Sequence, residues 1–168
     1  ITEVMTVDIP DVVNTIRWHA EAADKLFDQV APTGDGALAI IRREPLGVVA
    51  AVLPWNFPLM MAAWKLGPML ATGNAVVLKP AEQTSLSTIR LAELASDPGL
   101  PDAVAHVVTG VGDPVGTAIG LHPDVARVSS TGSTDTGPPF PRHPPPSTLT
   151  PPPPATPADP RAAQECTS

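Results

Sequence analysis

The sequence predicts an α/β protein in which one open parallel sheet carries helices on both faces. Three observations indicate this fold. Apolar runs of strand length recur along the first 137 of the 168 residues. Segments with helical periodicity separate these runs, as in parallel sheets joined by right-handed crossovers. Glycine and proline stand where helices are expected to end or begin.

Composition divides the chain into two unlike parts. Residues 1–137 hold all twelve glycines and eleven of the 23 prolines, whereas the last 31 residues hold twelve prolines and no glycine. Apolar residues make up 43% of the chain, which is enough for one domain with a core. Because proline removes backbone donors and forbids helix, we expect residues 138–168 to form a disordered, proline-rich tail.

The formal net charge is −7, and all of it comes from residues 1–137. An acidic chain without a basic stripe argues against nucleic acid or an anionic membrane as the partner. The apolar run after Pro58 is interrupted by Lys65 and Gly67, so it is too short to span a bilayer. Because no basic and apolar leader is present, we expect a cytoplasmic protein. The first residue is Ile1, which indicates a piece of a longer protein.

Residues 1–44 are predicted to form an arm, consisting of a helix and a hairpin, attached to the rest of the chain. Asp8 marks the helix start. Apolar residues then follow at helical spacing, at Val12, Ile16, Ala23, Phe27 and Val30. A turn cluster at 31–36 precedes a short strand at 38–42.

Residues 45–137 are predicted to contain the sheet. The expected strands are 47–53, 74–78, 104–108 and 125–129. Pro58 is expected at the first position of the helix over 59–72, and Gly73 at its C′ position. Thr84 or Ser85 can cap the second helix.

Two later segments also have the pattern of helix starts. Asp113 can cap a third helix, with Pro114 at its first position. The fourth strand is followed by Thr131 and Gly132, where another helix is expected to start. The junction between the third strand and the third helix contains the segment 110–116, whose glycine spacing is GxGxxxG. It is therefore weak evidence for a phosphate-binding loop.

The turn LPWNFP at 53–58 is the first candidate for a functional site. It joins the first strand of the sheet to the first helix, and open α/β sheets bind ligands at the carboxyl ends of their strands. Two prolines and two aromatic residues flank Asn56, whose amide can donate to an oxygen that gains negative charge. The simpler alternative is an ordinary turn residue.

Four stretches together resemble the aldehyde dehydrogenase superfamily. They are EPLGVVAAVLPWNFPL, GPMLATGNAVVLKPAEQTS, GLPDAVAHVVTGVGDPVG and STGSTDTG. Their order and separation match the family's nucleotide-binding domain, so the resemblance covers about residues 1–137. It implies a truncated, Rossmann-like sheet and the oxidation of aldehydes to carboxylic acids. The motifs are most similar to the branch that oxidises small ω-amino aldehydes in polyamine breakdown.

The resemblance implies NAD as the cofactor, with NADP less favoured. Lys79 and Glu82 resemble the pair that binds the adenosine ribose, since a carboxylate accepts bonds from the 2′-OH and 3′-OH and repels a 2′-phosphate. Outside this context, a solvated surface pair would be the preferred interpretation. Asn56 resembles the catalytic asparagine that stabilises the oxyanion. The implied cofactor-binding positions are Leu53, Pro54, Trp55, Asn56, Lys79, Ala81, Glu82, Gly112, Gly116, Gly132, Ser133 and Thr136.

Within this set, the resemblance implies that Gly112 and Gly116 let their helix approach the adenine. The pyrophosphate is expected at the helix opening with Ser133, where free N–H groups and the helix dipole favour an anion. Ser130 departs from the family, which usually has Phe at this position. Loss of a buried ring there would cost about 3 kcal/mol or more.

The resemblance also implies two residues that this sequence lacks. In the family, the cysteine nucleophile and the general-base glutamate lie beyond the point where this chain turns to proline. Cys166, the single cysteine, lies in the tail without an activating base nearby in the sequence. We therefore expect a fragment that is inactive alone. The abrupt change near codon 137 motivates the hypothesis of a reading-frame shift.

Partners follow from the same resemblance, since the full-length family acts on small aldehydes and forms homo-oligomers. A second interpretation is a non-catalytic nucleotide-binding or interaction module whose proline-rich tail docks on an SH3-like or WW-like groove. No metal site is predicted, because His19, His106 and His122 lack ligand spacing.

Overall fold

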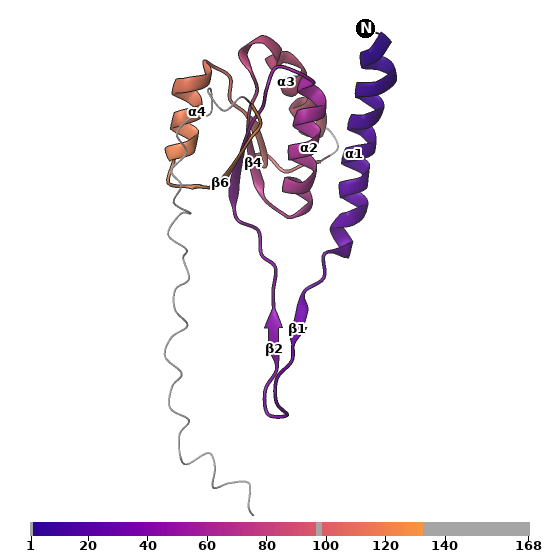
Figure 1. Cartoon of the computed structure of the whole chain (residues 1–168), viewed down its shortest axis with the longest axis vertical. Helices are drawn as coiled ribbons and strands as arrows, with labels where there is room; N and C mark the ends of the chain where they lie inside the picture. The colour runs from indigo at the N-terminus through magenta and orange to yellow at the C-terminus, as the bar shows by residue number, and fades with distance from the viewer. Residues whose placement is uncertain (1, 97–98, 133–168) are drawn as a thin grey trace, which may run out of the picture.

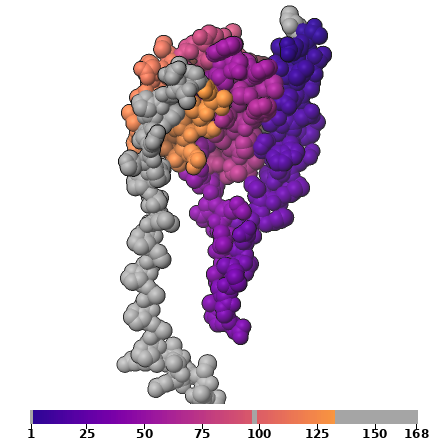
Figure 2. Space-filling model, in the orientation of Figure 1, coloured from indigo at the N-terminus to yellow at the C-terminus, as the bar shows by residue number. Residues whose placement is uncertain are grey.

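The computed structural model describes residues 2–96 and 99–132. The expectations for Ser133, Thr136 and the proline-rich tail therefore lie outside the described residues. Residues 2–44 form a long helix and a hairpin, and residues 45–132 form a sheet with its own helices (Figure 1). The hairpin projects as a narrow extension from the larger body (Figure 2). We call these two parts the arm and the body.

The body is built on four parallel strands in the order β5-β4-β3-β6. The strands are β3 (Val48–Val52), β4 (Ala75–Lys79), β5 (Ala105–Val107) and β6 (Val125–Ser130). Each begins and ends within one or two residues of a predicted strand, and each contains valine, a β-branched residue that favours strands. The predicted open parallel sheet is confirmed.

Three helices connect these strands: α2 (Pro58–Ala71), α3 (Ser85–Ser96) and α4 (Gly112–Leu121). α2 and α3 cover one face of the sheet, and α4 lies on the other (Figure 1). From β3 through β4 to β5, each new strand is added on the same side of the sheet. The chain then returns across the sheet and adds β6 on the other side of β3. Because crossovers are right-handed, this reversal moves α4 to the opposite face.

The core lies between the sheet and α2. Its buried side chains are Val49, Ala51, Leu53, Ala62, Leu66, Val76 and Leu78. Both Ala62 and Ala63 are fully buried, so small residues let α2 approach the strands closely. None of the helices in the described residues is long and apolar enough to cross a membrane.

The arm helix α1 (Ile9–Ala22) packs against α2. Gly67 permits a close approach, because a Cβ there would lie 2.8 Å from Nδ1 of His19. At the other end of the contact, Nε1 of Trp64 donates to Oδ2 of Asp11 at 3.0 Å. These contacts attach the arm helix to the body through α2.

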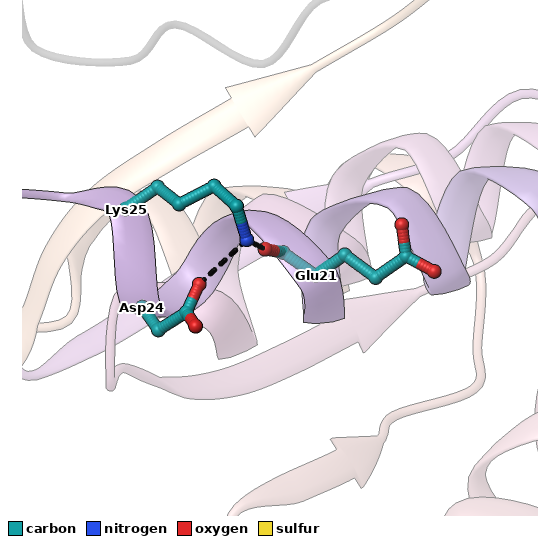
Figure 3. A network of polar contacts seen from close by, with 3 residues as sticks. All are labelled: Glu21, Asp24 and Lys25. Carbon is teal, nitrogen blue, oxygen red and sulfur yellow. Dashed lines mark hydrogen bonds and ion pairs between the residues drawn. The ribbon is translucent and has the colours of Figure 1, made fainter.

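The predicted extent of the arm helix is wrong at both ends. A π-helical turn, η1 (Val4–Asp8), precedes α1, so Asp8 has helical dihedral angles and forms no side-chain cap. At the far end, a 3₁₀ turn, η2 (Ala23–Lys25), follows Ala22. Lys25 Nζ donates to the backbone carbonyl of Glu21 and pairs with Oδ1 of Asp24 at 2.7 Å (Figure 3). The Lys25 side chain thus satisfies a carbonyl of the last helical turn.

After this turn the chain enters a hairpin. Strand β1 (Gln29–Ala31) pairs antiparallel with β2 (Ala39–Ile41). Val30 therefore lies in a strand and not in the helix that its spacing predicted. Pairing with a partner ten residues away overrides a helical spacing that continued by coincidence. The strand expected at 38–42 is present as β2.

Some of the predicted helix boundaries in the body are confirmed and others are wrong. Pro58 is the first residue of α2, and Gly73 has a φ of +79° just beyond it, as predicted. α4 begins at Gly112, so Asp113 lies inside the first turn and does not cap it. Thr84 does not cap α3, because its buried hydroxyl has no hydrogen-bond partner in the described chain.

Candidate functional site

The carboxyl ends of β3, β4 and β6 meet at one edge of the parallel sheet. The chain leaves β3 toward β4, whereas β6 lies on the other side of β3 and its chain arrives from β5. The connections on the two sides of β3 thus run over opposite faces, which is the arrangement in which doubly wound proteins bind ligands in a crevice beyond the strand ends. The turn at 53–57 and residues 131–132 follow the two strands that border it.

Lys79, Glu82 and Gly112 come together beside this crevice. Lys79 ends β4, and its Nζ lies 3.3 Å from Oε1 of Glu82. The Lys79 side chain is 3% exposed and that of Glu82 is 41% exposed. A solvated surface pair is therefore excluded for Lys79, since the cation is buried and its carboxylate partner faces solvent.

Gly112 places the start of α4 against this pair. A Cβ on Gly112 would lie 3.5 Å from Oε1 of Glu82 and 4.0 Å from Nζ of Lys79. The glycine thus leaves the approach to the ion pair open. Thirty residues separate Glu82 from Gly112 in the sequence, and only the fold brings the two together.

The hydrogen bonds around Glu82 favour its charged form. Its own backbone N–H, the Lys79 ammonium and the backbone N–H of Gly112 hold the pKa of the Glu82 carboxyl below its ordinary value, against the opposing effect of partial desolvation. The site therefore presents a carboxylate at neutral pH. Such a group accepts hydrogen bonds from hydroxyls.

The turn that carries Asn56 is attached to the same strand ends. Leu53 is buried, and its backbone N–H donates to the carbonyl of Lys79 at 2.9 Å. Phe57 adopts φ +49°, ψ +50° before α2 begins at Pro58. A left-handed conformation is unusual for a bulky residue and indicates that its surroundings impose the turn. Asn56 is exposed in this constrained turn.

The remaining predicted positions differ in their surroundings. Trp55 is 67% exposed, so it is not part of the core. Ala81 and Gly116 are buried. A Cβ added at Gly132 would meet no atom of the described residues within 4 Å. Ser133 and Thr136 lie outside the described residues.

One polar contact at the site was missed by the sequence analysis. Lys65 on α2 donates from Nζ to Oγ of Ser129 on β6 at 2.8 Å. The helix and the strand are far apart in the sequence, so spacing gave no indication of the contact. The one available signal was that Lys65 is charged within an otherwise apolar helix. Ser130, which follows Ser129 and is the last residue of β6, is exposed.

Two apolar hollows lie away from this crevice, among α1, α2 and α3. They have volumes of about 480 and 600 Å³ and share Ile16, Leu91 and Leu94 in their lining. Ligand sites combine an apolar pocket with convergent polar groups, and the first hollow is lined by apolar residues alone. The strand ends, where Lys79, Glu82 and Gly112 converge, are therefore a better candidate than the first hollow. No cluster of three metal-ligating side chains occurs among residues 2–96 and 99–132.

The strand order and the crevice define a doubly wound α/β protein. The model of the aldehyde dehydrogenase family matches residues 1–142. The chain belongs to this family.

Individual relatives agree with this assignment. The chain is 58% identical over 137 residues to aminoacetaldehyde dehydrogenase of Pseudomonas aeruginosa, covering 82% of this chain and 28% of that protein. It is 55% identical over 130 residues to the NADP/NAD-dependent aldehyde dehydrogenase PuuC of Escherichia coli, covering 77% of this chain and 26% of PuuC. The structure of PnpE in complex with nicotinamide adenine dinucleotide superposes on this chain with a TM-score of 0.79 at 44% identity. The match covers 80% of this chain and 28% of the PnpE chain. The chain thus spans little more than a quarter of the length of these proteins.

Proposed function

We propose that residues 45–137 of this chain are part of the NAD-binding domain of an aldehyde dehydrogenase that oxidises small ω-amino aldehydes to carboxylic acids. The observation that carries the proposal is the convergence of Lys79, Glu82 and Gly112 beside the crevice. The identity to aminoacetaldehyde dehydrogenase and PuuC supports the substrate class.

In this proposal, Glu82 accepts hydrogen bonds from the ribose hydroxyls and the buried Lys79 ammonium donates to them. Gly112 and Gly116 leave room for the adenine beside α4. Binding of NAD by PnpE supports the choice of cofactor. A 2′-phosphate beside Glu82 would place two negative charges together, so NAD is favoured over NADP. PuuC is named for both cofactors, so this preference needs its own measurement.

The catalytic role proposed for Asn56 is to donate from its side-chain amide to the oxyanion that forms when a thiolate attacks the aldehyde. A donor held in a constrained turn needs little rearrangement as charge develops, which is the source of this kind of stabilisation. Residues 1–137 contain no cysteine that could supply the thiolate. In this proposal, the water-activating glutamate of the family also has no counterpart in them. We therefore expect no aldehyde oxidation by the 168-residue chain alone.

Cofactor binding is tested by NMR, which detects weak complexes. On titration with NAD to several millimolar, we expect amide shift changes at Lys79, Glu82 and Gly112. Glu82→Gln should remove most of the response. Glu93→Gln is the matched control, because Glu93 also forms an i,i+3 ion pair, with Arg90, but on the exposed face of α3. An equal response in both variants, or shifts confined to other surfaces, would reject this assignment.

Turnover is tested by NADH formation with aminoacetaldehyde. Robust activity of the purified 168-residue chain would contradict the proposed inactivity. We further propose a reading-frame shift near codon 137, supported by the change in composition there. Translation of the gene in the other two frames should restore a glutamate strand and a cysteine loop, and their absence from both would reject the frameshift.

For the rest of the molecule, we propose that the arm takes part in homo-oligomer formation in the full-length protein. Val30, Ile40 and Ile41 on the hairpin are all more than half exposed, which fits a surface that another subunit covers. A cytoplasmic location remains our expectation from the sequence.

A further inference from the structure

The second hollow, the larger of the two among α1, α2 and α3, combines apolar walls with two cationic side chains. It has a volume of about 600 Å³ and lies between α1 and α3, which both pack on α2. Its apolar walls include Ile9 and Val12 of α1 and Leu91 and Leu94 of α3. Ligand pockets typically have mostly apolar walls and a few polar groups that orient the ligand, so this hollow has the composition of a binding site.

Solvent reaches part of the apolar wall. Val13 is 44% exposed and Leu94 is 49% exposed, whereas Val12 is 5% exposed. Along α1 the hollow extends from Ile9 to Arg17, which is about 12 Å from the rise per residue of an α-helix. An unbranched aliphatic chain of medium length can lie along this wall, and its binding would remove apolar surface from water.

Arg17 of α1 and Arg90 of α3 give the same hollow a positive charge. None of its lining residues in the described chain is acidic. The whole sequence has ten lysines and arginines against seventeen aspartates and glutamates, so two arginines without a lining carboxylate mark a local preference for an anion. Arg17 forms no ion pair within residues 2–96 and 99–132.

The other polar groups at the hollow are partly engaged. Nη1 of Arg90 donates to Oε2 of Glu93 at 2.9 Å, but a guanidinium has further N–H donors that remain for a ligand. The hydroxyl of Ser87 donates to the carbonyl of Thr84 at 3.3 Å. The guanidinium groups of Arg17 and Arg90 are therefore the donors for an anionic headgroup, and their planar geometry matches a carboxylate.

We propose that the second hollow binds a medium-chain fatty acid. The carboxylate accepts hydrogen bonds from Arg17 and Arg90, and the aliphatic chain lies along the apolar wall toward Ile9. Charge complementarity carries the choice of occupant, because the lining has two cations and no carboxylate. The inference goes beyond the proposed function and does not depend on it, since neither Lys79 nor Glu82 lines this hollow.

The test is an NMR titration of the full 168-residue chain with decanoate, below the concentration at which it forms micelles. Amide shift changes are expected at Val12, Arg17, Arg90 and Leu94. Three further probes separate the headgroup from the chain: acetate lacks the chain, 1-decanol lacks the charge, and decyltrimethylammonium reverses it. Each should bind at least about tenfold more weakly than decanoate, because it loses either the apolar burial or the charge-assisted hydrogen bonds.

Arginine variants test the headgroup site. Arg17→Gln should weaken decanoate binding at least about fivefold, since it removes a charge-assisted hydrogen bond. Arg127→Gln is the matched control, because Arg127 is also exposed but lies on β6 and does not line the hollow. Its affinity for decanoate should equal that of the unmodified chain. Arg90→Gln repeats the test on the facing helix, and circular dichroism of each variant alone checks its fold.

Each outcome decides. Absence of shifts, shifts confined to other surfaces, equal binding of 1-decanol or decyltrimethylammonium, or unchanged affinity in both Arg17→Gln and Arg90→Gln overturns the proposal. Light scattering tests a second copy of this chain as the occupant, and a dimer that decanoate does not dissociate also overturns it. A response to decanoate without one to NAD supports the hollow and counts against the proposed function. A response to NAD alone does the reverse.

Discussion

The arm and the body differ in the burial of their apolar residues. In the body, the strands and α2 enclose a core whose members include the fully buried Val76 and Leu78. In the described part of the arm, Val12 is the one buried hydrophobic residue, and it faces the body from α1. The hairpin exposes Leu38 at 74% and Ile40 at 59%. The described core therefore lies in the body, and the apolar side chains of the hairpin contribute little to it.

Leucine truncation gives the strongest test of this comparison. Leu78→Ala should lower the free energy of unfolding by about 3 kcal/mol, because it leaves a cavity in the core. Leu38→Ala, the same change on the exposed hairpin, should alter it by less than about 0.5 kcal/mol. Urea unfolding followed by circular dichroism measures both. Similar losses in the two variants would mean that the hairpin belongs to the cooperative core.

A buried asparagine gives the next largest expected effect. Oδ1 of Asn74 accepts from the N–H groups of Leu46 and Gly47 at 2.7 and 3.2 Å, and its Nδ2 donates to Oγ1 of Thr72 at 2.8 Å. Asn74→Ala should cost about 2–3 kcal/mol, since it removes several hydrogen bonds made by a buried side chain. Asn14→Ala on the exposed side of α1 is the control, and a comparable loss there would contradict the comparison.

The glycine that ends α2 should show a smaller effect. Gly73 has φ +79°, and a Cβ there would lie 3.0 Å from Cγ of Pro45. Gly73→Ala should cost about 1–2 kcal/mol because of the left-handed conformation. A Cβ at Gly36 in the hairpin loop would meet no atom within 4 Å, so Gly36→Ala should change the unfolding midpoint of the protein little. A smaller loss for Gly73→Ala than for Gly36→Ala would reject the strain argument.

The smallest effect concerns the ionisation of Glu82. Because its folded-state pKa is lowered, the charged form contributes stability at pH values above about 4.3, the ordinary glutamate pKa, and this contribution is lost as the pH falls through the folded-state pKa. NMR titration of the Glu82 side chain should show the lowered pKa. Lys79→Met should raise that pKa toward the ordinary value, and no change would show that Lys79 does not contribute.

The candidate site was predictable where it depends on local sequence. Pro58 and Gly73 bracket α2 because their own dihedral preferences decide the boundary, and the turn with Asn56 follows directly from the strand and helix around it. The arm shows the limit of this reasoning. Helical spacing continued to Val30, but pairing with β2 placed this residue in a strand.

The amino-acid sequence by itself determined the alternation of strands and helices, the proline and glycine boundaries, and the family motifs. Only the tertiary structure decided that β6 returns to pair with β3, that Lys79 is buried, and that Gly112 lies against Glu82. The physical reason is the range of the interactions. Local periodicity and backbone preference act over a few residues, whereas strand pairing and burial depend on which distant segments the crossovers bring together.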